Sequence, residues 1–383
     1  MIGRSFAERD YQVWFATSPV NWSALLRRGD QFGFSKVVSL ITSGIRDTYK
    51  TGAVLNFSTL SLRLPGFLGR MFSGMSQAFE NRAMSKLVKK AARLCPNPEY
   101  VVIESIPMVS KYLEIKSAFP NSRFVYRPSD PIFPRPEVPD ELRKHELAVV
   151  KDCDALLAVN QMALELYKGE VSTRSEMQVS GVLPNGFDAD AYRKDWEEPS
   201  EITCLRQDGK RLVVSYVGAS APYWEALVRL GETNQNLGVM IICPVPIPRN
   251  ILARIQANPR ISVIPGVEPS RVPSYVKNSD IIAVPYPPEC ADWWRGPHSK
   301  LYQAMAAKKP VVALNLGLGI DNPEIEQYST IDDFIFAFEK YNSADARDYS
   351  FDLSELDWSR FGDRLFNYLH KLNANHCPTN SSD

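Results

Sequence analysis

Short apolar runs alternate along the chain with longer stretches that carry apolar residues at helical spacing. In the first half, the runs that predict strands cover residues 11–17, 36–41, 100–105, 123–127 and 155–160. Between two of them, residues 75–94 place apolar side chains near a period of 3.6, which indicates an amphipathic helix. Because strands that alternate with helices pair in parallel, this half predicts an α/β layer.

The second half repeats this alternation after a polar stretch at residues 193–210. The runs that predict its elements cover residues 211–218, 238–244, 260–266, 280–286 and 310–315 for strands and 299–307 for a helix. We therefore predict an α/β fold of two Rossmann-like, doubly wound parallel-sheet domains, residues 1–200 and 201–355, facing a central cleft. Residues 356–373 are expected to form a helix that packs back toward the first domain, and residues 374–383 a flexible tail.

Charge and composition exclude several classes of protein. The 383 residues contain 44 Lys+Arg and 44 Asp+Glu, so no net field favours nucleic acid, and we expect no nucleic-acid partner. No apolar segment approaches the roughly 20 residues that span a bilayer, and residues 1–10 carry charges where a secretory signal would be apolar. The six cysteines are widely spaced, without the paired spacing of a zinc site, and indicate reduced thiols in the cytoplasm.

The helix predicted at residues 299–307 begins with a group suited to a diphosphate. Gly296 and Pro297 precede it, and its first turn carries His298, Ser299 and Lys300. Unpaired backbone N–H groups and a cation then lie at one end, where they could neutralise a phosphate leaving group without a metal ion. Gln303, one turn further on, could contact a ribose or sugar hydroxyl. The alternative is a capped surface helix with a solvated lysine.

Further polar side chains lie where predicted strands end. Asp130 follows the strand at residues 123–127 within Pro-Ser-Asp-Pro, where a carboxylate could act as general base on an alcohol. Glu104 ends the neighbouring strand and could orient a loop or contact an acceptor. In the second half, Gly218 ends a strand with small residues that would let the backbone approach a ligand, and Tyr286 ends another strand. An aspartate between two prolines is also an ordinary turn residue, so both readings of Asp130 stay open.

Two pairs of aspartates have the Asp-x-Asp spacing of some metal-binding motifs: Asp152 with Asp154, and Asp188 with Asp190. Each pair also fits a helix end or turn, which we favour, so we predict no metal site.

Residues 60–94 are basic and partly apolar. Glu80 is their one acid. The basic residues are Arg63, Arg70, Arg82, Lys86, Lys89, Lys90 and Arg93. Leu62, Leu64, Phe67, Leu68, Met71 and Phe72 are interleaved with the first two arginines. Such a segment could lie on an anionic leaflet, although an amphipathic core helix with a solvated basic face gives the same pattern.

With these motifs the chain resembles the GT-B glycosyltransferases, and among them the metal-independent, inverting bacterial glucuronosyltransferases of glycosyltransferase family 70. The motifs come in family order: YVVIES, RFVYRPSD, DALLAVN, LPNGFDADAY, VVSYVGAS, DIIAVPY, HSKLYQAMAAKKPVV and DWSRFGDRLF. The resemblance implies a general base at Asp130 and a diphosphate-binding lysine at Lys300, and Gly218 would lie under the donor. It implies donor contacts at Gly218, Ser220, Glu268, Tyr286, Ser299, Lys300 and Gln303, and an acceptor side with Glu104 and Arg127. The family's donor-contacting Gly-Glu-Met falls near Gly266-Val267-Glu268, where the glutamate is displaced by about one residue.

Retaining GT-B enzymes share similar motifs but carry a glutamate just before AMA, where this chain has Gln303. The resemblance therefore implies inverting transfer of a sugar, with glucuronic acid as the expected sugar, from a UDP-sugar to a lipid-linked oligosaccharide in polysaccharide biosynthesis. The donor is a substrate, and no cofactor is expected. The expected location is the cytoplasm, with peripheral contact between residues 60–94 and the inner face of the plasma membrane. Alternatives are a retaining transferase, a UDP-sugar epimerase, or an inactive GT-B module that binds a membrane or a partner.

Overall fold

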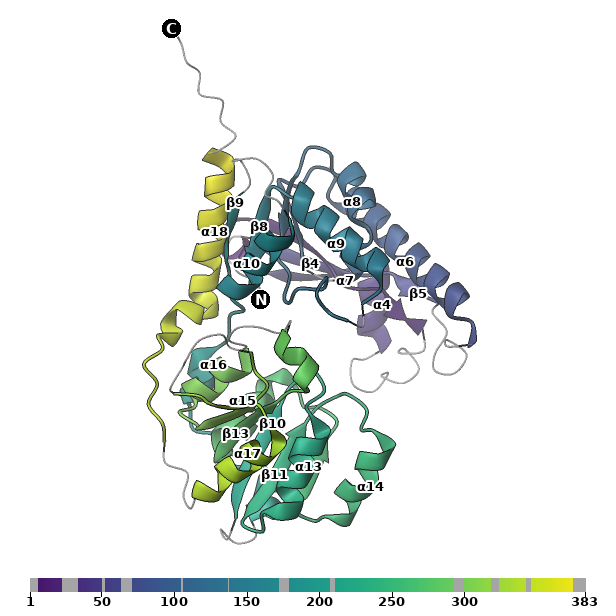
Figure 1. Ribbon diagram of the computed structural model, residues 1–383. Helices are drawn as coiled ribbons and strands as arrows, with labels where there is room; N and C mark the ends of the chain where they lie inside the picture. Colours follow the sequence, from purple (N-terminus) through teal and green to yellow (C-terminus); the bar gives the residue numbers. More distant parts are fainter. Residues whose placement is uncertain are drawn as a thin grey trace. The chain divides into compact units, whose positions relative to one another are not determined.

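The computed structural model describes most of the chain (Figure 1). The described residues are 6–22, 34–49, 52–62, 71–104, 106–136, 138–171, 179–206, 211–292, 299–317, 324–341 and 346–374. They divide into two compact units: Met1–Leu183 together with Phe361–Asp383, and Pro184–Arg360.

The first unit distributes its strands over three sheets. A four-stranded parallel sheet follows chain order, with β6 (Tyr100–Ile103), β7 (Arg123–Tyr126), β8 (Ala155–Ala158) and β9 (Val179–Val182). A second sheet has the order β1 (Gln12–Ala16), β4 (Ala53–Phe57), β3 (Ile45–Thr48), and β3 runs antiparallel to β4. A short pair joins β2 (Val20–Asn21) and β5 (Leu60–Ser61). The predicted α/β class is confirmed, but the first unit is not one continuous parallel sheet.

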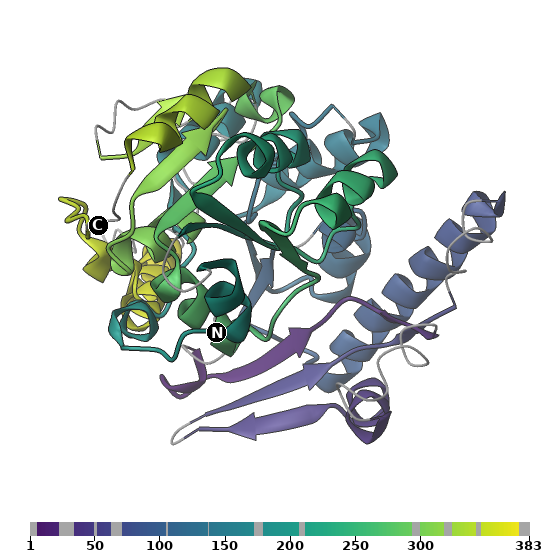
Figure 2. The same ribbon diagram turned by 90° about the horizontal axis from the view of Figure 1, so that it is seen from below.

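Seven helices are described in this unit: α4 (Phe34–Thr42), α6 (Ser73–Leu94), α7 (Ile106–Val109), α8 (Tyr112–Ala118), α9 (Asp140–Asp152), α10 (Gln161–Glu170) and α18 (Trp358–Ala374), the last of which begins in the second unit. Figure 2 shows the long α6 beside the strands of the β1–β4–β3 sheet.

The predicted strand at residues 36–41 is wrong, since these residues lie in α4. Phe34, Val37, Val38 and Ile41 recur at the spacing of one helical face once Phe34 is included. Within residues 36–41 alone, the β-branched residues Val37 and Val38 favoured a strand, because that range leaves out Phe34.

The second unit is a six-stranded parallel sheet. Its strands are β10 (Leu212–Val217), β11 (Leu237–Ile242), β12 (Ile261–Ile264), β13 (Ile281–Pro285), β14 (Val311–Leu314) and β15 (Glu326–Tyr328). Their spatial order is β12-β11-β10-β13-β14-β15. This is the doubly wound order in which the chain reverses direction between β10 and β13, and ligands bind such sheets outside the carboxyl ends of the strands at this point.

Both faces of this sheet are buried, which explains its uninterrupted apolar runs. Along β10 and β11, Val214 and Ile241 belong to one core cluster while Val213 and Met240 belong to the cluster on the other face. The helices of the unit are α11 (Ala189–Arg193), α12 (Ser200–Arg206), α13 (Trp224–Thr233), α14 (Arg249–Ala257), α15 (Val272–Asn278), α16 (Ser299–Ala306) and α17 (Ile331–Phe336). Short 3₁₀ helices are η1 (Pro269–Arg271), η2 (Pro288–Asp292), η3 (Ala337–Lys340) and η4 (Leu353–Leu356).

The boundary between the units falls at Leu183, earlier than the predicted residue 200. The polar stretch that suggested a linker contains α12, whose Ile202 and Leu205 are buried and whose Arg206 pairs with Asp280 at 2.6 Å. The stretch is polar because the residues on the outer face of this packed helix are polar.

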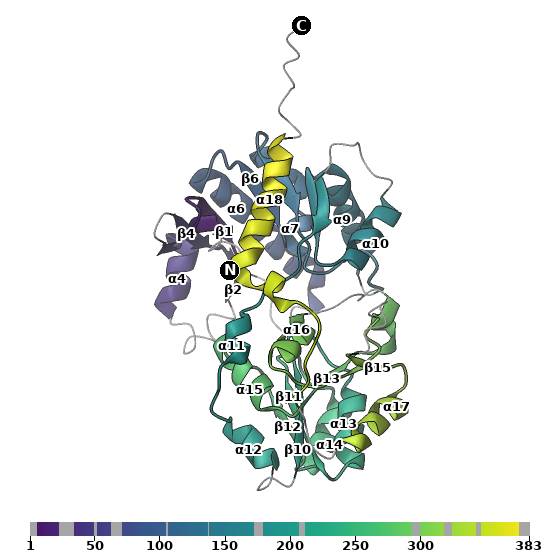
Figure 3. The same cartoon turned by 90° about the vertical axis from the view of Figure 1, so that its left-hand side faces the viewer.

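Helix α18 begins in the second unit and continues on the first from Phe361 (Figure 3). On the first unit, the Phe366 ring packs on Phe6 at 4.9 Å, and the Tyr368 hydroxyl donates to the Val182 carbonyl oxygen at 3.2 Å. The predicted tail lies outside the described residues except for Ala374. Within the described parts of the chain, no helix is long and apolar enough to cross a membrane.

Candidate active site

Three residues of the second unit gather around the Lys300 ammonium group. Lys300 lies in the first turn of α16. Its Nζ donates to the Tyr286 hydroxyl at 2.6 Å and lies 3.4 Å from the Ser220 hydroxyl oxygen. It also lies 5.5 Å from the centre of the Tyr216 ring and 5.1 Å from that of Tyr286. Tyr216 and Ser220 come from the end of β10 and Tyr286 from the end of β13, so the cluster marks the point where strand order reverses.

Gly218 makes room for the lysine. A Cβ at this position would collide with Lys300 Cε and lie 2.8 Å from the Tyr216 hydroxyl oxygen. The glycine lets the aliphatic stem of Lys300 pass across the end of β10. The sequence predicted that a ligand approaches the backbone here, and the structure shows that the Lys300 side chain lies against Gly218.

Gly218→Ala is therefore expected to displace the Lys300 ammonium from Tyr286 without unfolding the protein. The Lys300 side chain is flexible and can move, so the cost falls on ligand binding. UDP is part of the donor that the resemblance implies, and we expect its affinity to fall about tenfold, the loss of roughly one charge-assisted hydrogen bond. Calorimetric titration with UDP measures it, and Gly74→Ala is the control because a Cβ there meets nothing within 4 Å. Equal UDP affinity in wild type and Gly218→Ala would contradict this account of the glycine.

Tyr286 is held rigidly behind the lysine. It is only 1% exposed. Its N–H donates to the Leu314 carbonyl at 2.9 Å, and its own carbonyl accepts from Asn315 Nδ2 at 2.9 Å. Asn315 has a φ of +55°, a left-handed conformation that asparagine tolerates. Residues at the end of β14 therefore hold the backbone of Tyr286, whose hydroxyl contacts Lys300.

Tyr216 and Asn315 belong to this cluster, and the sequence did not single them out. The Tyr216 hydroxyl donates to the Ser220 carbonyl oxygen at 2.7 Å and so shapes the loop after β10. Burial raises the pKa of Tyr216, which keeps its hydroxyl protonated as a donor. A tyrosine near the end of a mostly aliphatic strand was the available signal.

The other predicted donor residues lie around the cluster or apart from it. Ser299 and Gln303 are half-buried on α16, next to Lys300 and one turn after it. Glu268 is exposed and follows β12, which lies two strands from β10, or about 10 Å at ordinary strand spacing. His298 lies outside the described residues.

In the first unit, Asp130 lies in the segment that follows β7. Its side chain is 35% exposed, and its Oδ2 lies 3.5 Å from Arg135 Nη2. Arg135 Nε also donates to the Pro131 carbonyl at 2.9 Å. Arg135, which the sequence did not indicate, thus orients the carboxylate while leaving it open to solvent.

Glu146 on α9 holds the segment that follows β7 in place through hydrogen bonds. It is fully buried, and its carboxylate accepts from the backbone N–H groups of Ile132 and Phe133. The hydroxyls of Tyr126 and Tyr167 donate to its Oε1 at 2.8 and 2.7 Å. Burial raises the pKa of Glu146, and these four donors oppose the rise. The carboxylate therefore ties the backbone just after Asp130 to the core.

Glu146→Ala is expected to destabilise the first unit by about 2–4 kcal/mol, because it leaves buried donors unpaired and opens a cavity. Glu146→Gln should retain most of the stability, because its one carbonyl oxygen can still accept from Ile132 and Phe133. Urea unfolding measures both, with Glu141→Ala as the control, since Glu141 is exposed on the same helix. A loss below about 1 kcal/mol in Glu146→Ala would contradict the anchoring role.

Glu104 and Arg127 form the remaining pair. Arg127 is 4% exposed, and its Nη1 lies 3.4 Å from Glu104 Oε1. Its Nη2 donates to the Leu183 carbonyl at 3.2 Å. Burial raises the pKa of Glu104, and the charge of Arg127 opposes the rise. The charge of Asp130 also acts on Arg127, so the predicted base and the two predicted acceptor-side residues lie in one unit.

The two aspartate pairs have structural partners. Asp152 accepts from the Tyr112 hydroxyl at 2.9 Å, and Asp154 accepts from the Phe124 N–H at 2.7 Å. Asp188 caps α11 by accepting from the Ala191 N–H. Across the described ranges, no group of three or more potential metal ligands is found.

The basic segment is only partly a solvated face. Lys90 donates to the carbonyl oxygens of Ile41 at 2.6 Å and Ser58 at 3.2 Å, and burial lowers its pKa. It therefore joins α6 to its neighbours and does not belong to the predicted basic face. Arg63 and Arg70 lie outside the described residues. Large apolar side chains that are exposed on the segment are Leu60, Leu62, Met71, Phe72 and Met75.

Comparison with known proteins agrees with this architecture. Residues 1–159 match the family model of the N-terminal domain of glucuronosyltransferase GumK. The structure of an α,α-trehalose-phosphate synthase from Burkholderia xenovorans with glucose-6-phosphate superposes with a TM-score of 0.66 at 12% identity, covering 96% of each chain. Anabaena Alr3699/HepE with UDP and glucose gives a TM-score of 0.62 at 14% identity, covering 94% of this chain and 99% of that one. No curated protein sequence matches the chain.

The fold is therefore the GT-B fold of glycosyltransferases, built from two Rossmann-like units. The resemblance to glucuronosyltransferases that the motifs indicated is confirmed, because the N-terminal 159 residues are similar to the N-terminal domain of GumK.

Proposed function

We propose that the protein is a glycosyltransferase that transfers a sugar from a UDP-sugar to an acceptor hydroxyl. The observation that carries the proposal is the Lys300 cluster at the strand-order reversal of the second unit. An ammonium group, a fixed tyrosine hydroxyl and a helix N-terminus supply the donors that a diphosphate requires. Uridine as the base is supported by the similarly folded HepE, whose structure contains UDP.

In the proposed reaction, Asp130 removes the proton of the acceptor hydroxyl as its oxygen attacks the anomeric carbon. The bond from that carbon to the UDP oxygen breaks, and a new carbon–oxygen bond forms. Negative charge develops on the departing diphosphate, where Lys300 and the Tyr286 hydroxyl stabilise it. Arg135 keeps the carboxylate oriented, and Glu146 fixes the backbone that carries it. The proposal requires no metal ion, since Lys300 supplies the countercharge.

We further propose that transfer inverts the anomeric configuration. Gln303 on α16 is the supporting observation, since it stands where the retaining GT-B enzymes described above carry a glutamate. The fold does not decide the point, because a trehalose-6-phosphate synthase studied for glycosyltransfer with retention has a similar structure, with a TM-score of 0.59 at 13% identity and coverage of 95% and 97% of the two chains. Retention is therefore the second candidate.

Glucuronic acid is the proposed sugar and a lipid-linked oligosaccharide the proposed acceptor. The match of residues 1–159 to the GumK domain supports the sugar. The exposed side chains of Leu60, Leu62, Met71, Phe72 and Met75, with the basic residues of α6, support peripheral contact with an anionic membrane at the cytoplasmic face.

Thermal stabilisation by nucleotides tests the donor site. Purified protein in EDTA is heated with UDP, UDP-glucuronic acid, UDP-glucose, GDP-mannose or ADP, because a ligand that binds only the folded state raises its stability. The proposal predicts a rise with uridine nucleotides, largest for one UDP-sugar, and no rise in Lys300→Ala. No rise with any nucleotide would contradict the donor site. UDP binding without turnover on any acceptor would favour an inactive binding module.

A further inference from the structure

Two buried donors converge on the backbone carbonyl oxygen of Ser220. The Tyr216 hydroxyl donates to this oxygen at 2.7 Å, and the Cys243 thiol donates to it at 3.3 Å. Tyr216 lies near the end of β10 and Cys243 directly follows β11, so the two donors come from neighbouring strands. A carbonyl oxygen has two lone pairs, and these two donors occupy both. The proposed reaction gives no role to Cys243.

Burial keeps both donors protonated. Tyr216 is fully buried, and Cys243 is 1% exposed. Burial raises the pKa of each group, and the charge of Lys300 opposes the rise in the pKa of Cys243. Because a thiol is a weaker donor than a hydroxyl, Tyr216 makes the stronger of the two hydrogen bonds to the carbonyl. The effect of the Lys300 charge shows that the thiol lies close to the proposed donor site.

The carbonyl belongs to a loop that is also held at both of its ends. Backbone N–H groups of Gly218 and Tyr223 donate to the carbonyl oxygens at the ends of β11 and β13, at 3.0 and 2.9 Å. Ser220 lies between these two residues, and its hydroxyl oxygen lies 3.4 Å from Lys300 Nζ. The two buried donors thus fix the middle of the loop, at the residue whose hydroxyl lies beside the ammonium group.

We propose that Tyr216 and Cys243 are positioning residues that hold the Ser220 hydroxyl as a further donor to the diphosphate of the bound nucleotide. The inference rests on the proposed transferase function, because it takes Lys300 as the group that binds this diphosphate. A hydroxyl that is already oriented loses less conformational freedom on binding than one on a loop that is free to move. Loss of either buried donor therefore weakens nucleotide binding through Ser220, without any contact between that donor and the ligand.

Calorimetric titration with UDP in the wild-type and Ser220→Ala backgrounds tests the positioning. Tyr216→Phe removes the hydroxyl but keeps the ring that lies 5.5 Å from Lys300 Nζ. We expect UDP affinity to fall about fivefold in Tyr216→Phe, about twofold in Cys243→Ala and about tenfold in Ser220→Ala, as for single hydrogen bonds. In the Ser220→Ala background neither change should weaken binding further, because the positioned hydroxyl is absent. A merely structural role would lower the affinity equally in both backgrounds.

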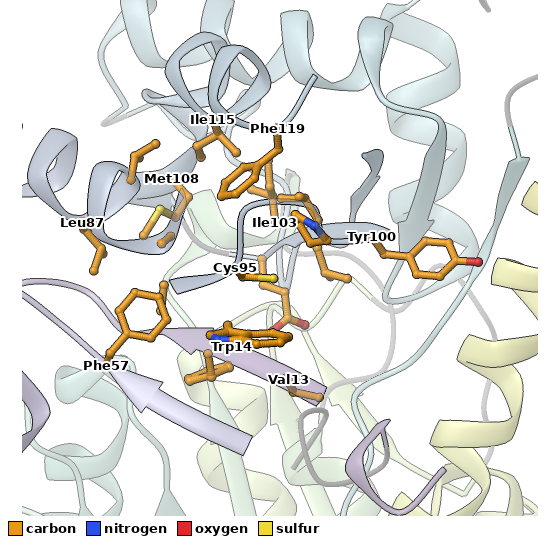
Figure 4. A pocket seen from close by; sticks show the side chains of 18 of the residues that line it. Val13, Trp14, Phe57, Leu87, Cys95, Tyr100, Ile103, Met108, Ile115 and Phe119 are labelled. Carbon is orange, nitrogen blue, oxygen red and sulfur yellow. The ribbon is translucent and has the colours of Figure 1, made fainter. Parts of the chain in front are cut away.

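Matched controls for the two substitutions come from the first unit. Figure 4 shows Cys95 and Tyr100 among the residues that line a pocket there. Cys95 is buried, as Cys243 is, and burial raises the pKa of both Cys95 and Tyr100. Cys95→Ala and Tyr100→Phe should leave UDP affinity unchanged. Urea unfolding of every variant verifies that the titrated protein is folded.

Wild-type UDP affinity in Tyr216→Phe, or losses of the same size in both backgrounds, would overturn the positioning role. If Ser220→Ala binds UDP as wild type does while Lys300→Ala does not, this inference fails and the proposed function stands. If Lys300→Ala also binds UDP as wild type does, the proposed donor site itself is wrong. Should Tyr216→Phe fail to fold, Cys243→Ala in the two backgrounds decides the question, because that change removes a single buried sulfur atom.

Discussion

Lys300→Ala is expected to lower kcat about 100- to 1,000-fold, which corresponds to about 3–4 kcal/mol of lost transition-state stabilisation. The ammonium lies 2.6 Å from the Tyr286 hydroxyl oxygen, where it would meet the charge that develops on the departing diphosphate. Because the diphosphate is also charged before transfer, affinity for UDP should fall as well. Initial rates at saturating donor separate the two effects.

The matched control for this variant is Lys308→Ala. Lys308 follows the other end of α16 and forms an ion pair with Asp348, with its side chain 61% exposed. Exposed pairs of this kind contribute little to stability, so the control should behave as wild type. A loss of kcat below about tenfold in Lys300→Ala would contradict the role of Lys300 in stabilising the departing diphosphate.

Asp130→Asn should lower kcat by about 100- to 10,000-fold, the range that a positioned general base contributes. The amide has nearly the size of the carboxylate but cannot accept the acceptor's proton. The donor site lies in the other unit, so stabilisation by UDP should be unchanged, which separates this variant from Lys300→Ala. Rates with a saturating acceptor measure the effect.

Asp140→Asn provides the control, since Asp140 is 92% exposed at the start of α9. If Asp130→Asn retains near-normal turnover, Asp130 is an ordinary turn residue held by Arg135, and another group is the base.

The second unit could be predicted from the sequence because its order is local. Apolar runs such as residues 238–244 belong to strands buried on both faces, and turns follow each of them. Lys300, Tyr286 and Gly218 were predicted because parallel strands and following helices place such residues at one edge. Strand order itself, which puts β10 beside β13, is a long-range pairing that no local pattern contains.

The supporting residues could not be predicted, because their partners are distant in sequence or lie on other elements. In the sequence, Glu146 is one of several polar residues of an amphipathic helix. Only the folded unit brings the Tyr167 hydroxyl and the segment after Asp130 within hydrogen-bond distance of it. Lys90 looked solvated because the carbonyls of Ile41 and Ser58 come from elements 49 and 32 residues away. The polar residues of α12 suggested a linker because Arg206 finds Asp280 only in the folded unit.

The anomeric configuration of the product tests the central claim most directly. The protein is incubated in EDTA with the UDP-sugar that stabilises it most and with an acceptor, and the new linkage is determined by NMR coupling constants. An α-linked UDP-sugar should yield a β-linked product, as direct attack on the anomeric carbon with Asp130 as base requires. An α-linked product would contradict the inverting mechanism and the role of Asp130, and would place the protein with the retaining GT-B enzymes.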